Sequence, residues 1–135
     1  MDLFSIKTIK ELFNRQETRP RKGLGQNFLI SRGVLGDILK AADLKESDTV
    51  LEVGSGIGTL TRGLAQSAKI VITVEKDSVM VKILKETAKD LSNIEIIQGD
   101  ILKQNLAKLS YPQLSLAKFT CHEQIHSTYR WRFQV

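Results

Sequence analysis

Apolar residues in the first 45 positions recur three or four apart, which is the spacing of helices. The first such set is Ile6, Ile9, Leu12 and Phe13, and the second, following Ser31, is Val34, Leu35, Ile38, Leu39 and Ala42. Each predicts an amphipathic helix. The stretch between them holds four basic residues from Arg15 to Lys22 and then Gly23 and Gly25, so it is expected to form a basic loop.

Three short apolar runs follow, at residues 49–53, 70–74 and 94–97, and each reads as a strand. Helical patterns separate them, marked by Leu60, Leu64 and Ala65 and then by Met80, Ile83, Leu84 and Ala88. The middle run is nearly all apolar, as in a strand buried on both faces of a parallel sheet. The alternation predicts an α/β fold with a doubly wound parallel sheet. Weaker patterns at 114–117 and 129–133 indicate a fourth strand and a further one.

Composition narrows the class of protein rather than its function. A chain of 135 residues suits a single soluble domain, and 41% hydrophobic with 26% charged residues is ordinary. A net charge of +5 favours polyanionic partners. One cysteine, Cys121, suits a reducing cytosol, and no apolar run is long enough to span a membrane. No secretory signal is recognised at the N-terminus, so a cytoplasmic location is expected.

A glycine-rich turn, Glu52-Val53-Gly54-Ser55-Gly56-Ile57-Gly58, follows the first predicted strand and opens a helix. That is the context in which such a turn binds a ligand, because glycines let it approach the backbone closely. A dinucleotide-binding turn would have its third glycine at Thr59. The pattern instead resembles the class I S-adenosylmethionine-dependent methyltransferases, whose cofactor carries no phosphate.

Acidic residues stand near the ends of all three predicted strands. Glu52 precedes the turn, Glu75 ends the second strand, and Asp100 follows the third. The carboxyl ends of parallel strands meet at one edge, where an acid about 20 residues after the turn can bond ribose hydroxyls. This series supports a cofactor site, although each acid alone is more often a solvated surface residue.

The run Lys22-Gly23-Leu24-Gly25-Gln26-Asn27-Phe28-Leu29 carries a narrower resemblance. With the turn and Gly99-Asp100, it resembles the ribosomal RNA adenine dimethyltransferases, over about residues 6–102, and favours their small-subunit branch. The resemblance implies S-adenosyl-L-methionine as cofactor, rRNA or a pre-ribosomal particle as partner, and no stable protein partner. It also implies that Asn27 and Leu29 contact the cofactor, with Gly54 at its methionine part, Glu75 at the ribose and Asp100 at the adenine.

The family's catalytic motif, Asn-Leu-Pro-Tyr, is not found after the fourth predicted strand. At that place the chain reads Lys118-Phe119-Thr120-Cys121. We therefore divide the chain into a cofactor-contacting segment (1–30), a partial α/β domain (31–117) that is incomplete at its C-terminal side, and a divergent tail (118–135). No catalytic residue is assigned. The expectation is a truncated or frameshifted product, with an inactive cofactor- or RNA-binding fragment as the alternative to a methyltransferase.

The tail also contains His122-Glu123-Gln124-Ile125-His126, which fits the H-E-x-x-H pattern of zinc hydrolases. The extended form of that motif would place Gly and His where Tyr129 and Arg132 stand. Three fixed positions are weak support, so a zinc hydrolase is a remote alternative and no metal site is assigned.

Overall fold

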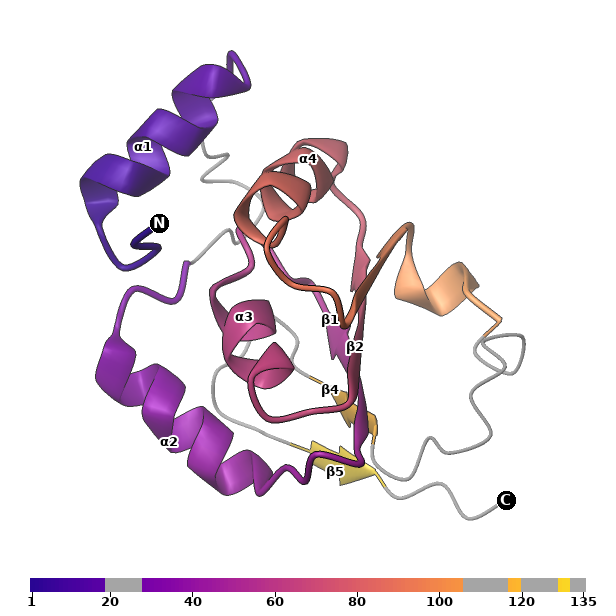
Figure 1. Ribbon diagram of the computed structural model, residues 1–135. Coiled ribbons are helices and arrows are strands. Elements are labelled where there is room, and N and C mark those ends of the chain that lie inside the picture. Colours follow the sequence, from indigo (N-terminus) through magenta and orange to yellow (C-terminus); the bar gives the residue numbers. More distant parts are fainter. Residues whose placement is uncertain (19–27, 106–116, 120–128, 132–135) are drawn as a thin grey trace.

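A computed structural model describes residues 1–18, 28–105, 117–119 and 129–131 (Figure 1). Its helices are α1 (Ile6–Arg15), α2 (Arg32–Ala42), α3 (Thr59–Ala65) and α4 (Ser78–Thr87), with the short 3₁₀ helix η2 (Ile101–Lys103). Its strands are β1 (Thr49–Val53), β2 (Ile70–Glu75), β3 (Ile94–Gln98), β4 (Ala117–Phe119) and β5 (Tyr129–Trp131). No helix in these ranges is long and apolar enough to cross a membrane.

The first three strands form a parallel sheet in the order β1-β2-β3. Val50 pairs with Val71, and Val71 in turn pairs with Ile94, which aligns the amino ends of the strands. The short strands β4 and β5 pair antiparallel in a separate sheet, and β4 lies beside β1. The parallel α/β sheet is thus as predicted.

Helices α3 and α4 lie on the same face of the parallel sheet, and α2 packs beside α3 (Figure 1). Successive right-handed crossovers in one direction place their helices on one face. On this face Val50 and Val71 are fully buried against Leu64 of α3. The opposite face carries a second cluster of Leu51, Ile72 and Val74, with Ile101 of η2 at its border. No α-helix within the described ranges covers that opposite face.

Serine caps start the two N-terminal helices where the sequence pattern placed them. The hydroxyl of Ser5 accepts from the Thr8 N–H, and that of Ser31 accepts from the Val34 N–H. Such a cap satisfies one of the free N–H groups of the first turn. Of the fourth strand predicted at 114–117, only Ala117 is described, as the first residue of β4 (Ala117–Phe119); residues 114–116 are outside the described ranges.

Asn93 closes the loop between α3 and β2. Its amide nitrogen donates to the carbonyl of Ala65, the last residue of α3 (2.9 Å), and to that of Ala68 in the loop that follows (3.0 Å). We expect Asn93→Ala to lower the free energy of unfolding by about 1–2 kcal/mol, because both carbonyls lose a partly buried donor. Urea unfolding measures this, with the exposed Asn14→Ala as a control expected to stay within about 0.5 kcal/mol. Equal effects in the two variants would contradict the assigned role of Asn93.

Candidate cofactor site

The carboxyl ends of β1, β2 and β3 are held together beyond the sheet itself. The Gly54 N–H donates to the Val74 carbonyl and the Gly99 N–H donates to the Glu75 carbonyl, both at 2.9 Å. The glycine loop that follows β1 has positive φ at Gly54 (75°), Gly56 (55°) and Gly58 (88°). Residues with a side chain rarely adopt this conformation, which explains the glycine at every second position.

Glu75 ties the end of β2 to the glycine loop. One of its carboxylate oxygens accepts from the Gly56 N–H at 3.0 Å, and the other accepts from the Asp77 N–H at 2.9 Å. The residue is only 8% exposed. A buried carboxylate fixed by two backbone donors is a rigid, negatively charged acceptor at the edge where a ligand would lie.

Glu52 has a different environment from Glu75, although both lie at the carboxyl end of a strand. Its side chain is buried and accepts from the Thr61 hydroxyl at 2.6 Å, which links β1 to α3 beneath the loop. Burial raises its pKa to about 7; the hydroxyls of Thr61 and Thr73 oppose the rise, and the charge of Glu75 adds to it. Glu52 is therefore a buried structural residue that supports the loop, and its carboxyl is not accessible to a ligand.

Asp100 lies just beyond β3 and begins η2. Its carboxylate accepts from the Leu102 N–H at 3.0 Å and pairs with the Lys76 ammonium at 3.2 Å. The backbone hydrogen bond, and then the Lys76 contact, lower the pKa of this carboxyl below its usual range. Asp100 is thus ionised at neutral pH, and it follows the strand that neighbours β2, which Glu75 ends.

Two hydroxyls at the glycine loop were not singled out by the sequence. The side-chain oxygens of Ser55 and Thr59 are buried without a hydrogen-bond partner in the structure. Buried polar groups are almost always bonded, so such an orphan often marks a place where a ligand or water binds. Serine and threonine are common beside glycines, so only the folded structure reveals that these two hydroxyls are buried without a partner.

Comparison with known proteins decides the family. The sequence model of "Ribosomal RNA adenine dimethylase" matches residues 17–131, which is most of the chain. This chain belongs to the ribosomal RNA adenine dimethylase family. The match continues past residue 102, where the quoted motifs end, into the tail.

The relatives of this dimethylase-family chain are longer than it is. "Ribosomal RNA small subunit methyltransferase A" of Natranaerobius thermophilus is 41% identical over 123 residues, covering 90% of this chain and 41% of the relative. The protein of the same name from Dehalococcoides mccartyi is 52% identical over 100 residues, covering 74% and 34%. The chain therefore spans about two fifths or less of these relatives.

Two solved methyltransferase structures share the fold. The dimethyladenosine transferase from Plasmodium falciparum has a TM-score of 0.59 and 34% identity, covering 70% of this chain and 34% of that one. The 23S rRNA methyltransferase ErmE has a TM-score of 0.57 and 29% identity, covering 69% and 47%. The fold is accordingly the class I methyltransferase α/β fold, incomplete at its C-terminal side, and the dimethylase family implies S-adenosylmethionine as cofactor.

The residues at the strand ends fit that cofactor. The loop has no side chain at the positions with positive φ, and two unpartnered hydroxyls lie within it and just after it, at Ser55 and Thr59. Glu75 and Asp100 present carboxylates at this edge, which suit hydroxyl, amine and sulfonium groups and repel a phosphate.

Two predicted contacts lie in the N-terminal segment. Leu29 is half-buried and follows Phe28, which packs against a buried hydrophobic cluster that includes Ile57 of the glycine loop. Asn27 is outside the described residues. The His122–His126 motif also lies outside them, and the described ranges hold no group of three or more potential metal ligands.

Proposed function

We propose that this chain binds S-adenosylmethionine at the carboxyl edge of β1–β3 and is the cofactor-binding part of an rRNA adenine N6-dimethyltransferase. The observation that carries the proposal is the juxtaposition of the glycine loop with Glu75, whose carboxylate is fixed by the Gly56 and Asp77 N–H groups. Gly54 adjoins the methionine part, Glu75 accepts from ribose hydroxyls, and Asp100 accepts from the adenine amine. Asn27 and Leu29 contact the cofactor from the N-terminal segment.

When bound, S-adenosylmethionine supplies an electrophilic methyl group. The residues of this chain orient the cofactor. The Glu75 and Asp100 carboxylates fix the nucleoside, and the loop glycines allow the methionine part to approach the backbone. Their contribution to methyl transfer is positioning, which acts by holding reacting groups in line. Ribosomal RNA of the small subunit or its precursor particle is the proposed partner, in keeping with the net charge of +5.

We further propose that this chain, as it stands, binds without turnover. An exocyclic amine is a poor nucleophile, and the family's Asn-Leu-Pro-Tyr motif supplies the acceptors and the aromatic ring that hold the extruded base. Nothing in residues 114–135 matches that motif. Incubation with labelled cofactor and undermethylated small-subunit rRNA tests the proposal, with the longer Natranaerobius relative as positive control. Label incorporated into rRNA by the present chain would overturn it.

Glu75→Ala is expected to weaken S-adenosylmethionine binding about thirtyfold in titration calorimetry, because hydrogen bonds to a charged group contribute about 2 kcal/mol. Glu46→Ala is the matched control: this exposed carboxylate precedes β1, at the opposite edge of the sheet. Thermal unfolding of both variants verifies that each is folded. A folded wild-type chain that does not bind the cofactor, or equal binding by the two variants, would refute the assignment of the site.

A further inference from the structure

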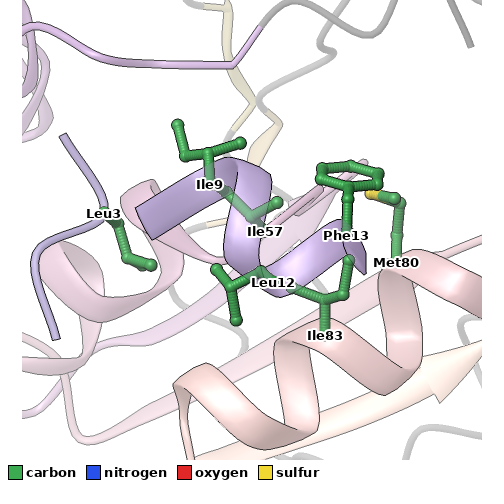
Figure 2. Packing of buried hydrophobic residues seen from close by; sticks show 7 residues of the cluster. All are labelled: Leu3, Ile9, Leu12, Phe13, Ile57, Met80 and Ile83. Carbon is green, nitrogen blue, oxygen red and sulfur yellow. The ribbon is translucent and has the colours of Figure 1, made fainter. Parts of the chain in front are cut away.

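Helix α1 packs on the underside of the glycine loop. Its apolar face joins one buried cluster with residues of the loop and of α4, as Figure 2 shows; the members are Leu3, Ile9, Leu12, Phe13, Ile57, Met80 and Ile83. Ile57 lies within the loop itself, between Gly56 and Gly58, and is 2% exposed. The position of the loop therefore depends on the helix beneath it.

The loop is also held from the side of α4. The Thr87 hydroxyl donates to the Ile57 carbonyl at 2.9 Å, so the backbone of Ile57 is fixed by α4 while its side chain packs against α1. The Arg15 guanidinium at the end of α1 pairs with Glu86 of α4 at 2.8 Å. Helix α1, the loop and α4 thus form one packed unit.

The N-terminal segment, residues 1–15, contacts residues 28–32 at both of their ends. At the first end, the rings of Phe13 and Phe28 have centroids 5.5 Å apart and are tilted by 54°, a favourable aromatic geometry. At the other end, the Arg32 guanidinium pairs with the Asp2 carboxylate at 2.8 Å and lies 4.3 Å from the Phe4 ring centroid. Leu29, one of the proposed cofactor contacts, lies in the sequence between these two contact points, Phe28 and Arg32.

We infer that residues 1–15 are a positioning element for the cofactor site. They act on the glycine loop through Ile57, and on Leu29 through the contacts with Phe28 and Arg32. This inference rests on the proposed function, and it assigns a role to a helix that precedes the family match at residue 17. The element touches no reacting atom. It raises the fraction of molecules whose loop and N-terminal segment already have the binding geometry.

The first test removes the contacts of Arg32, in which Arg32 and Asp2 are largely exposed and Phe4 is half-buried, so that only a small loss of stability is expected. The double variant Asp2→Ala/Phe4→Ala is titrated with S-adenosylmethionine and compared with Lys45→Gln, which breaks the exposed Lys45–Asp43 pair near β1. If the competent fraction falls to about one fifth, the apparent Kd rises about fivefold. We expect this rise in the double variant, with a Tm only slightly lowered by truncation of the half-buried Phe4, and wild-type affinity in Lys45→Gln.

The second test addresses the buried end of the element. Phe13→Leu shortens the side chain that contacts Phe28, and Val71→Ala truncates a fully buried residue near the amino end of β2, away from the site. Both variants should lower the Tm, but only Phe13→Leu should raise the Kd for S-adenosylmethionine. Loss of affinity in both, in proportion to the lost stability, would show a merely structural role and overturn the inference.

The outcomes separate the two claims. A wild-type chain that is folded but does not bind S-adenosylmethionine refutes the proposed function and the positioning role together. If the wild type binds and the Asp2→Ala/Phe4→Ala or Phe13→Leu variant binds equally well, the proposed function stands and the positioning role alone is refuted.

Discussion

Gly58→Ala is expected to lower the free energy of unfolding by about 3 kcal/mol, since a left-handed backbone and an overpacked side chain each cost about 1–3 kcal/mol. Gly58 has φ of 88°, and an added Cβ would lie 2.6 Å from Leu84 Cδ1 and 3.0 Å from Thr87 Oγ1. Leu84 is fully buried, and Thr87 holds the Ile57 carbonyl, so neither neighbour can yield without disturbing the loop. Thermal unfolding should show a Tm lower by about 10 °C.

Gly36→Ala is the matched control for this substitution. Gly36 lies within α2, and a Cβ added there meets no atom within 4 Å. Alanine at such a helical position should raise stability by about 0.5–1 kcal/mol. A Gly58→Ala chain as stable as the wild type would show that the loop adopts another conformation.

The stability of the wild-type chain is expected to fall by about 3 kcal/mol as pH rises from 4.5 to about 7, through Glu52 alone. Burial raises the pKa of this carboxyl from 4.5 to about 7 in the folded chain. Between the two values the folded state holds a proton that the unfolded state has released. The contribution of Glu52 protonation to folding stability is therefore complete below pH 4.5 and is lost as pH rises through about 7.

Glu52→Gln removes the titration while keeping an oxygen that can accept from the Thr61 hydroxyl. Urea unfolding between pH 5 and 8 should show that the free energy of unfolding of this variant increases relative to that of the wild type as pH rises. The pKa values of Asp90 and Asp100 are lowered, chiefly by hydrogen bonds from Arg62 and from the Leu102 N–H, so both stay ionised throughout this range. Both histidines are present in the two chains and cancel in the comparison. Parallel stability curves would contradict a protonated Glu52.

Local patterns sufficed to predict the strands and helices that build the site. The apolar runs at 49–53, 70–74 and 94–97 coincide with β1, β2 and β3 to within one residue at each end. Their parallel direction also follows from the pattern, because a helical segment between consecutive strands makes a crossover connection. Their order along the sheet, β1-β2-β3, is known only from the structure. The chain belongs to the family that the Gln26–Leu29 run and the glycine loop indicated.

The separate roles of the acids could not be read from the sequence. Glu52 and Glu75 both lie at the carboxyl end of a strand, yet Glu52 accepts a hydrogen bond from Thr61 of α3 while Glu75 accepts one from the loop backbone. Which of them is accessible to a ligand depends on the path of the loop, and therefore on three glycine conformations. Tertiary contacts of this kind have no periodic signal.

The partner of the first helix was likewise not predictable. Periodicity gave α1 an apolar face of four residues, but Ile6 is 59% exposed and only the other three are buried. A helical pattern specifies which side chains share a face, whereas the surface that covers the face is chosen by the rest of the fold. Its packing on Ile57 of the glycine loop emerged only from the structure.

The order β1-β2-β3 in space repeats the order of the strands in the chain. Each strand therefore adds to an edge formed by the segment synthesised just before it, and the sheet can grow in one direction as the polypeptide leaves the ribosome. The glycine loop, Glu75 and Asp100 are complete once residue 100 has emerged. An enzyme family that modifies ribosomal RNA can thus assemble its cofactor edge early in its own translation.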